Sequence, residues 1–354
     1  MASKKRSFSW GIIGTGTIAR QFAADLRELP QARIAAVCSR SPKTGGTFAE
    51  KTGGAKSYVD LDAFLTDPAI EAVYIATPNA LHATQAVAAL KAGKAVLIEK
   101  PVATSSRDAQ AIADAAERSR CFAMEAMWSR FLPAVQAARA LLREGAIGDV
   151  TGIEGELAYR QDEQLRSRFF DPALGGGASL DLGVYLLSLA TDLLGDSPTA
   201  ISGRWRAVGT GVDMRAEYHV EFGTAKAALF CGFDRNGRNA LTVYGTKGAI
   251  RLNAPFIKAQ SFSVYSGALR DLPLVGSAAD VTGHAGKVLS RLPVPGRRVK
   301  RFAFPGGGLQ FEAKAVMEAV RSGAVQSDVM PLAQSVAVLR MIEKVLGRPP
   351  ENRS

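Results

Sequence analysis

The fold of this chain is decided by a stretch near its start, FSWGIIGTGTIA at residues 8–19. An apolar run is followed by Gly14, Gly16 and Ala19 in the spacing G-x-G-x-x-A, and residues 20–29 then have a helical pattern. Gly14 permits a tight turn, Gly16 lets the backbone approach a pyrophosphate, and Ala19 lets the helix pack close to the strand. The stretch predicts a strand, a phosphate-binding loop and a helix whose N-terminus binds the phosphates.

The residues that follow alternate between strand and helix patterns. Strands are predicted at 33–38, 56–58, 72–76 and 95–98, and helices at 60–65, 80–92 and 105–118. This alternation predicts a parallel, doubly wound sheet, which binds ligands beyond the carboxyl ends of its strands. Besides the two glycines, the residues that we expect to contact a dinucleotide there are Thr15, Thr17, Ile18, Tyr58, Ala76, Thr77, Asn79, His82 and Glu99. For His82 the alternative is a packed structural role.

The end of the second predicted strand indicates which dinucleotide binds. An NAD enzyme places an acid there for the ribose hydroxyls, whereas this chain has Ser39, Arg40 and Ser41, with Lys43 just beyond. Hydroxyls and cations suit a 2′-phosphate, which a carboxylate would repel. We therefore predict NADP as the cofactor. The alternative is a solvent-exposed Arg-Ser turn without a cofactor role.

A second stretch, VLIEKP at residues 96–101, supplies the expected chemical centre. An apolar strand runs directly into Glu99, Lys100 and Pro101. A lysine buried at a strand end is costly, and burial shifts its pKa readily, so it can donate to a carbonyl or alkoxide oxygen. Lys100 is therefore a predicted catalytic residue that also contacts the cofactor. For the bond before Pro101 the default expectation is trans, with a cis bond as the alternative.

The run GGGASLDLGVY at residues 175–185 opens a second region with candidate functional side chains. Residues 179–194 have helical spacing, which places Asp181 and Tyr185 on one face, four residues apart. An acid on an otherwise apolar helix needs a partner, and Lys100 is a candidate for it. The alternative is a buried Asp181 bound by the glycine loop, with Tyr185 in the core.

From residue 150 onward the pattern changes to short β-rich runs joined by turns, which predicts a second, α+β domain. The fold class is therefore α/β, with an N-terminal Rossmann domain at 1–128 and a domain with a large, mainly antiparallel, open-faced sheet at 129–330. A C-terminal helix at 331–354 is expected to return to the first domain. Near the border, Trp128 and Arg130 are predicted to line the cofactor site or to pack between domains. Residues 166–171 are predicted to form a substrate-facing loop.

Composition argues against several other classes of protein. The 354 residues carry a formal net charge of +11, but most of the excess lies in 4–6 and in 251–301, which hold nine Lys and Arg against two Asp. No nucleic-acid recognition motif accompanies them, so a solvated basic loop is the simpler interpretation. No apolar run reaches the roughly 18 residues that cross a membrane, and three scattered cysteines indicate neither disulfides nor a metal site. We expect a cytoplasmic protein with no metal, nucleic-acid or membrane partner.

Together these motifs resemble the glucose-fructose oxidoreductase and inositol dehydrogenase (Gfo/Idh/MocA) family. The glycine loop, ATPNALH at 76–82 and EKP at 99–101 carry this resemblance. MEAMWSRFLP at 124–133 and the run at 175–185 are similar to a branch with NADP-dependent D-xylose dehydrogenases, dimeric dihydrodiol dehydrogenases and aldose-aldose oxidoreductases. The resemblance implies that Lys100, Asp181 and Tyr185 surround the carbon that is oxidised, with Tyr185 where inositol dehydrogenases carry His. It also implies a sugar or diol substrate and a homodimer that pairs through the open sheet.

Two other functions remain open at this point. A nonreleasing aldose-aldose oxidoreductase would hold NADP tightly and pass hydride between two sugars. A sugar or dinucleotide sensor would keep the fold without catalysis, although a sensor has no need of Lys100, Asp181 and Tyr185 together. Similarity at the level of the fold does not fix the substrate.

Overall fold

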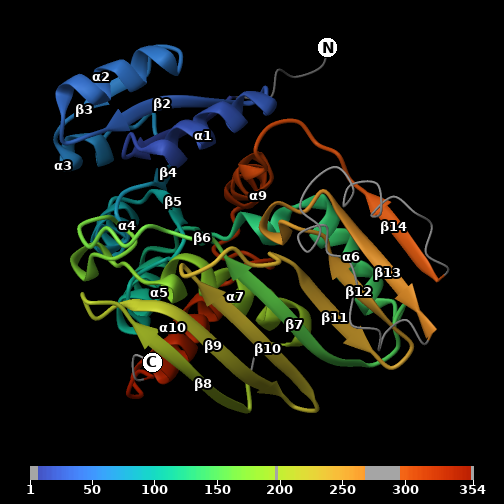
Figure 1. Ribbon diagram of the computed structural model, residues 1–354. Coiled ribbons are helices and arrows are strands. Elements are labelled where there is room, and N and C mark those ends of the chain that lie inside the picture. The colour runs from blue at the N-terminus through green and yellow to red at the C-terminus, as the bar shows by residue number, and fades with distance from the viewer. Residues whose placement is uncertain (1–6, 196–197, 268–295, 352–354) are drawn as a thin grey trace, which may run out of the picture. The chain divides into compact units, whose positions relative to one another are not determined.

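The structure is a computed structural model that describes residues 7–195, 198–267 and 296–351. The chain divides into two compact units (Figure 1). The first unit contains Met1–Trp128 and Pro305–Leu339, and the second contains Ser129–Phe304 and Arg340–Ser354. Each unit is built around its own sheet.

The first unit contains a six-stranded parallel sheet in the order β3-β2-β1-β4-β5-β6. Its strands are β1 (Phe8–Ile13), β2 (Ala32–Cys38), β3 (Lys56–Tyr58), β4 (Ala72–Ile75), β5 (Ala95–Glu99) and β6 (Ala123–Ala126). Every neighbouring pair is parallel, which confirms the predicted doubly wound fold. The chain order reverses between β1 and β4, and ligands bind in the crevice at such a reversal.

Helices pack against this sheet, and polar side chains cap three of them. The helices are α1 (Thr17–Asp25), α2 (Pro42–Lys51), α3 (Leu61–Leu65), α4 (His82–Lys91) and α5 (Ser106–Ser119), with the short turns η1 (Leu26–Glu28) and η2 (Asn79–Leu81). Ser41, Asp60 and Ser105 accept a backbone N–H at the starts of α2, α3 and α5. The Phe22 ring of α1 stacks on Tyr74 of β4 with 3.8 Å between centroids, and both are fully buried. Because truncating such an aromatic to Ala costs about 3–5 kcal/mol, this stack holds α1, the helix after the glycine loop, on the sheet.

The first unit also includes a late segment of the chain with α9 (Leu309–Ser322) and the beginning of α10 (Leu332–Leu346). The sequence pattern assigns residues 305–330 to the second domain, whereas the structure places them in the first unit. The physical reason is Asp25 at the end of α1. Its carboxylate accepts the backbone N–H groups of Gly307 at 2.6 Å and Leu309 at 2.9 Å, and so caps α9. A contact across 282 positions leaves no local signal in the sequence.

The second unit contains an eight-stranded sheet in the order β14-β13-β12-β11-β7-β10-β9-β8. Its strands are β7 (Val150–Ala158), β8 (Ala200–Ala207), β9 (Asp213–Phe222), β10 (Ala225–Gly232), β11 (Leu241–Gly245), β12 (Gly248–Leu252), β13 (Ser261–Ser266) and β14 (Arg297–Arg301). The β7–β10 pair is parallel and the other neighbouring pairs are antiparallel, which confirms the predicted mainly antiparallel sheet. The basic strand β14 is not predicted from the sequence. Residues 268–295, the rest of that basic segment, lie outside the described residues.

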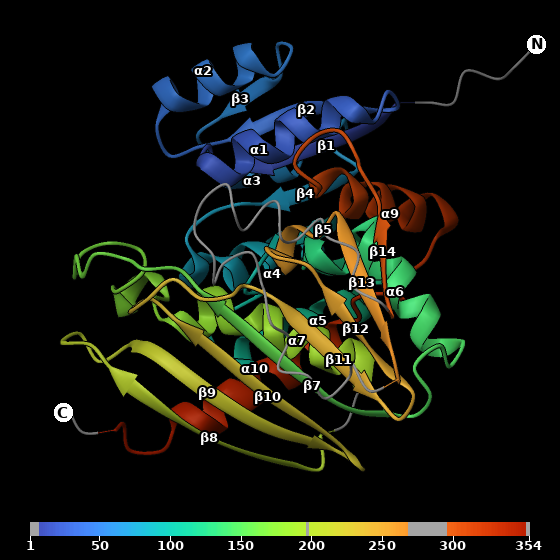
Figure 2. The same ribbon diagram turned by 45° about the vertical axis from the view of Figure 1, so that its right-hand side comes forward.

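Helices α6 (Pro133–Arg143) and α7 (Val184–Leu194) pack on one face of this sheet, α6 against β12 and β13 and α7 against β7 and β10 (Figure 2). The unit also has the short turns η3 (Trp128–Phe131), η4 (Pro172–Leu174) and η6 (Phe256–Lys258), of which η3 begins on the last residue of the first unit. Contrary to the sequence expectation, the helical stretch Pro172–Leu194 is long and apolar enough to cross a membrane. However, 72% of its apolar window is buried, as in the core helix of a folded domain.

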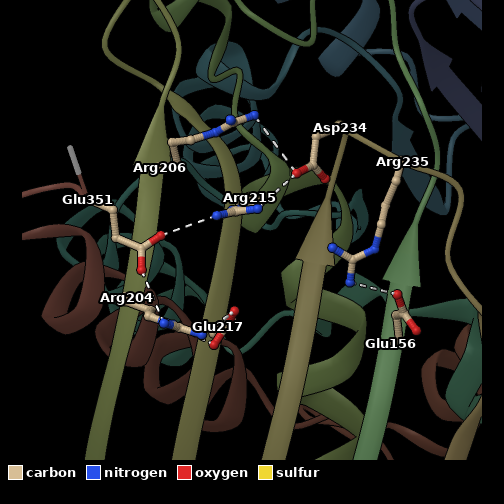
Figure 3. A network of polar contacts seen from close by, with 8 residues as sticks. All are labelled: Glu156, Arg204, Arg206, Arg215, Glu217, Asp234, Arg235 and Glu351. Atoms are coloured by element: carbon tan, nitrogen blue, oxygen red, sulfur yellow. Dashed lines mark hydrogen bonds and ion pairs between the residues drawn. The ribbon is translucent and has the colours of Figure 1, made fainter. Parts of the chain in front are cut away.

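Small and polar side chains cover the face of the sheet opposite these helices, and ion pairs connect its strands (Figure 3). Arg204 of β8 donates to Glu217 of β9 at 2.7 Å and pairs with Glu351 at 3.4 Å. Arg215 joins Glu351 to Asp234, each at 3.4 Å. The network is completed by Arg206, which pairs with Asp234, and by the pair Arg235 and Glu156. This charged, open face is the one that the sequence predicts for self-association.

Candidate functional site

The first unit brings the ends of several parallel strands to one edge of its sheet, which we call the strand-end edge. Gly14 follows β1 there, Ser39 follows β2, Ala76 follows β4 and Lys100 follows β5. Gly14 has a φ of +103°, and a Cβ at this position would lie 2.5 Å from the carbonyl oxygen of Ala76. Glycine is therefore required at position 14, because the loop after β1 presses against the chain leaving β4.

The glycine loop leaves room for a ligand at the start of α1. A Cβ at Gly16 would meet nothing within 4 Å, so no protein contact explains this glycine. Among the described residues, no side chain caps the first N–H groups of α1. These donors are available to phosphate oxygens. Arg20, which the sequence patterns do not single out, holds the loop by donating to the Thr15 carbonyl at 2.8 Å and to Thr17 Oγ1 at 3.1 Å.

The end of β2 combines hydroxyl groups with exposed cations. Ser39 Oγ lies 2.9 Å from Thr44 Oγ1, and Thr15 Oγ1 donates to the same Thr44 oxygen at 3.5 Å. Arg40 and Lys43 are exposed beside them. Thr44 is a candidate site residue that sequence reasoning missed, because it lies inside α2 rather than at the strand end.

Tyr58, the last residue of β3, has its hydroxyl group engaged within the protein. The hydroxyl donates to Asp67 Oδ2 at 2.6 Å, and this bond lowers the pKa of Asp67. The Tyr58 carbonyl accepts the backbone N–H of Ser39 at 3.0 Å. The residue thus supports the end of β2, and its hydroxyl group is committed to Asp67.

His82 is a structural link between two loops of the strand-end edge. It is fully buried, with Nδ1 2.8 Å from the Pro101 carbonyl oxygen and Nε2 2.9 Å from that of Thr77. Burial lowers its pKa, although the two carbonyl oxygens act in the opposite direction. The structure therefore favours the packed structural alternative over contact with the cofactor. In the same loop, Thr77 Oγ1 donates to Gln85 Oε1 at 2.7 Å, and Asn79 begins the turn η2.

Lys100 is half-buried and follows β5 directly. The Lys100–Pro101 peptide bond is cis, against the default expectation. The preceding Glu99 is turned into the core, where it accepts the Tyr74 hydroxyl and, at 3.2 Å, the backbone N–H of Lys100. Burial raises the pKa of Glu99 to about 7. The Glu99 side chain therefore packs beneath Lys100, and the contact of this residue with the cofactor stays a prediction.

The second unit places Asp181 and Tyr185 in one continuous helical segment. The residues Ser179–Gly183 form a π-helical turn (η5), and α7 then begins at Val184, so the predicted α-helix starts irregularly. The Asp181 side chain is 15% exposed and pairs with Arg168 at 3.4 Å, whereas Tyr185 is buried. Arg168 lies over the Phe169 ring, 4.1 Å from its centroid. The predicted substrate-facing loop thus contributes Arg168 as an ion-pair partner of Asp181.

Arg130 is a core residue of the second unit, and its predicted place in the cofactor site stays a prediction. It is fully buried, donates from Nε to Ser188 Oγ at 2.8 Å, and lies 4.0 Å from Asp192. The carboxylate of Asp192 is also 3.0 Å from Arg139. Trp128 is half-buried at the end of the first unit. Within the described residues, no group of His, Cys, Asp and Glu side chains is arranged to hold a metal ion.

Two family descriptions match the chain. Residues 8–127 match the oxidoreductase family with an NAD-binding Rossmann fold, and residues 135–251 match the GFO/IDH/MocA C-terminal domain. Trans-1,2-dihydrobenzene-1,2-diol dehydrogenase from Bos taurus is 32% identical over 341 residues, with 95% of each chain covered. The human protein of the same name is 31% identical with the same coverage.

Solved structures share the fold over nearly the whole chain. Aldose-aldose oxidoreductase from Caulobacter crescentus, complexed with glycerol, has a TM-score of 0.81 at 24% identity and covers 96% of both chains. Levoglucosan dehydrogenase, complexed with NADH and levoglucosan, has a TM-score of 0.80 at 22% identity over 97% of both chains. The 3-ketoreductase KijD10 from Actinomadura kijaniata, complexed with NADP and TDP-benzene, has a TM-score of 0.76 at 22% identity, covering 96% of this chain and 97% of that one. With both domains matched and a relative 32% identical over 95% of its length, the chain belongs to the Gfo/Idh/MocA family of oxidoreductases.

Proposed function

We propose that this protein is an NADP-dependent dehydrogenase that transfers hydride between the nicotinamide and a carbinol carbon, either C1 of an aldose or a vicinal diol. The observation that carries the proposal is the shared edge of the first sheet, where Lys100 follows β5 and the open glycine loop follows β1. A cation that can donate to an alkoxide thus lies on the edge where this fold binds its dinucleotide. The diol substrate is supported by the dehydrogenase relatives, and the aldose by the motifs shared with sugar dehydrogenases.

The residues of the first unit fit a dinucleotide, and those at the end of β2 favour NADP. The open space at Gly16 and the uncapped start of α1 suit a pyrophosphate. Ser39, Arg40 and Lys43 suit a 2′-phosphate, and Thr44 adds a further hydroxyl beside Ser39. The structural neighbours include complexes with NADP and with NADH, so the choice rests on these side chains.

In the proposed mechanism, Lys100, Tyr185 and Asp181 act on one carbinol group. The nicotinamide, when bound, accepts the hydride. Tyr185 accepts the hydroxyl proton, Lys100 stabilises the developing oxyanion, and Asp181 binds a neighbouring substrate hydroxyl. The roles of Lys100 and Tyr185 can be exchanged without changing the overall reaction.

The proposal is tested with a panel of aldoses, polyols and trans-dihydrodiols, with NADP and NAD run in parallel and NADPH absorbance as the signal. Reduction of NADP by at least one aldose or diol, with a clear preference over NAD, is the expected result. NADP that stays bound through purification and turns over with pairs of aldoses would instead indicate a nonreleasing oxidoreductase. Tight NADP binding with no turnover on any member would indicate a sensor.

We also propose that the open face of the second sheet pairs two copies of the chain. A hollow of about 1480 Å³ lies over this face and is lined by short side chains such as Ser202, Ala228 and Thr242. The charged residues of the network in Figure 3 are of both signs, which suits contact between identical surfaces. Light scattering coupled to size exclusion should give the mass of a dimer, and a monomeric mass would contradict the pairing.

A further inference from the structure

A buried carboxylate lies beneath the glycine run of the second unit. Asp213, the first residue of β9, is 2% exposed. Its Oδ2 accepts both the backbone N–H and the hydroxyl group of Ser179, each at 2.7 Å. Ser179 is the first residue of the π-helical turn that contains Asp181. One carboxylate oxygen from a distant strand therefore holds the start of this turn.

The glycine run is shaped around this carboxylate. Gly177 has a φ of +116°, and a Cβ there would lie 2.3 Å from Asp213 Oδ1. A Cβ at Gly176 would lie 2.8 Å from the carbonyl oxygen of Phe169. Neither position has room for a side chain while Asp213 and the preceding loop keep their places. Gly177 thus packs directly against the carboxylate of Asp213, an acid that the sequence pattern does not single out.

Two further groups hold the same turn. The Tyr218 hydroxyl lies 2.5 Å from Ser179 Oγ. Since Ser179 donates its proton to Asp213, Tyr218 is the donor in this contact, and burial raises the pKa of Tyr218 so that it keeps its proton. At the other end of the turn, a Cβ at Gly183 would lie 3.2 Å from Cys231 Sγ. The turn is therefore hydrogen-bonded at Ser179 to residues of β9 and packs at Gly183 against Cys231 of β10.

Both the π-helical turn and the buried carboxylate of Asp213 are energetically costly. A π-helical turn is rare, and such turns occur frequently at functional sites. An acid buried to this degree is costly unless its donors are in place, and burial raises the pKa of Asp213. The turn carries Asp181 two residues after Ser179, and α7 continues it to Tyr185. The bonds of Asp213 thus fix the segment from which both proposed site residues project.

We propose that Asp213, acting through Ser179, is a positioning residue that holds the π-helical turn so that Asp181 and Tyr185 are aligned for hydride transfer. This inference rests on the proposed function, because it assigns the turn a role in that reaction. Misplacement of a reacting group by about 1 Å can cost about 10²-fold in rate. Loss of the Asp213 bonds should therefore act on turnover and leave cofactor binding by the first unit unchanged.

The test compares three variants of this network with one control. Asp213→Ala removes both bonds to Ser179, Asp213→Asn keeps one oxygen as an acceptor, and Ser179→Ala keeps the backbone bond but loses the hydroxyl. The matched control is Asp192→Asn, which alters a buried carboxylate at the other end of the same helix. It should lower thermal stability without changing kcat.

Turnover is measured with D-xylose, D-glucose and a trans-dihydrodiol, each with hydrogen or deuterium at the reacting carbon. Asp213→Ala should lower kcat by about 10²-fold and raise the deuterium isotope effect, because hydride transfer becomes rate-limiting, while the Kd for NADP stays within about twofold. Asp213→Asn should recover most of the lost rate, and Ser179→Ala should lie between the two. An unchanged kcat in Asp213→Ala, or an equal loss in Asp192→Asn, would overturn the proposal.

Amide hydrogen exchange provides a readout that needs no substrate. The segment 178–185 should exchange at least tenfold faster in Asp213→Ala than in the unmodified protein, and no faster in Asp192→Asn. Unchanged exchange in Asp213→Ala would overturn the positioning role whatever the activity. If the unmodified protein turns over no aldose or diol, the proposed function fails. Faster exchange in Asp213→Ala would still show that Asp213 stabilises the π-helical turn.

Discussion

The strand-end edge of the first unit and the π-helical turn of the second each carry part of the proposed chemistry, but they are held in different ways. At the strand-end edge, parallel strand pairing and the His82 link between two loops fix the residues beside Lys100. In the second unit, one carboxylate from β9 fixes the turn that carries Asp181. The first arrangement spreads its support over many local contacts, whereas the second concentrates its hydrogen bonds on Ser179, which Asp213 and Tyr218 both contact.

Because of this difference, we expect mutations in the two regions to change different properties of the enzyme. Substitutions at the strand-end edge should affect cofactor binding or a single chemical group, without moving the backbone. Substitutions beneath the π-helical turn should affect turnover through the alignment of Asp181 and Tyr185. The two regions are therefore separable by measuring the Kd for NADP and kcat in the same variants.

The largest effect is expected from Lys100→Met, which removes the cation without adding bulk. Turnover should fall by about 10²–10⁴-fold, the range for a lost acid–base group, while the Kd for NADP stays within a few-fold. Stopped-flow turnover and isothermal titration calorimetry with NADP measure the two quantities. Near-normal turnover would show that Lys100 takes no part in the chemistry. The strand-end edge would then not carry the part of the reaction that we assign to it.

A smaller effect is expected at the end of β2, where Arg40→Ala tests the 2′-phosphate site. The kcat/KM for NADP should fall by about 10–100-fold and that for NAD should change little, because an arginine–phosphate contact is lost. Arg33→Ala, an exposed arginine at the other end of β2, is the matched control. Equal losses with NADP and NAD would show that Arg40 does not distinguish the cofactors.

Gly16→Ala should weaken NADP binding by about tenfold without affecting folding. A Cβ at this position meets no protein atom within 4 Å. The added methyl group should therefore clash with the bound pyrophosphate and leave the fold undisturbed. Gly46→Ala in α2, which also has open space, is the control and should raise stability by about 0.5–1 kcal/mol. Unchanged NADP affinity in Gly16→Ala would argue against a phosphate at the start of α1.

The smallest effect that we expect is a change in the pH dependence of stability, caused by Glu312 in α9. Its carboxyl group is buried like that of Asp213 but lacks hydrogen-bond donors like those that Ser179 gives Asp213. Within the described residues neither of its oxygens has a hydrogen-bond partner, and burial, followed by the nearby Glu99, Asp25 and Glu125, raises its pKa well above the usual value. The folded state therefore binds protons more readily than the unfolded state at Glu312 and Glu99. Stability should fall as the pH rises above the unfolded pKa values, toward and beyond about 7.

Glu312→Gln should accordingly raise the Tm at about pH 8 by roughly 2–4 °C, as expected for a gain of about 1 kcal/mol, and flatten the dependence of Tm on pH. Glu318→Gln, on the exposed side of the same helix, serves as the control and should leave the Tm profile unchanged. A Tm of Glu312→Gln that falls more steeply with pH would contradict the protonated state of Glu312. Thermal unfolding across the pH range measures both variants.

The sequence predicts the first unit well because its signals are local. The spacing of Gly14 and Gly16, the strand that ends just before Lys100 and the cap at Asp60 each depend on neighbouring residues. It does not reveal the contact of Asp25 with α9 or that of Asp213 with Ser179, because these side chains act across 282 and 34 positions. The buried positions of Glu99 and Arg130 are missed for a related reason, since only burial shows that a polar side chain faces the core, whereas the packed role of His82 is one of the sequence alternatives.

The central claim is that hydride passes between a carbinol carbon and the nicotinamide of NADP. It is tested most directly by incubating the protein with NADP and D-xylose, D-glucose or a trans-dihydrodiol deuterated at the reacting carbon, followed by mass spectrometry of the cofactor. The account predicts one deuterium on the reduced nicotinamide of NADPH, with formation slowed by about 10²–10⁴-fold in Lys100→Met. Reduced cofactor without deuterium, or label transferred equally fast in Lys100→Met, would contradict it.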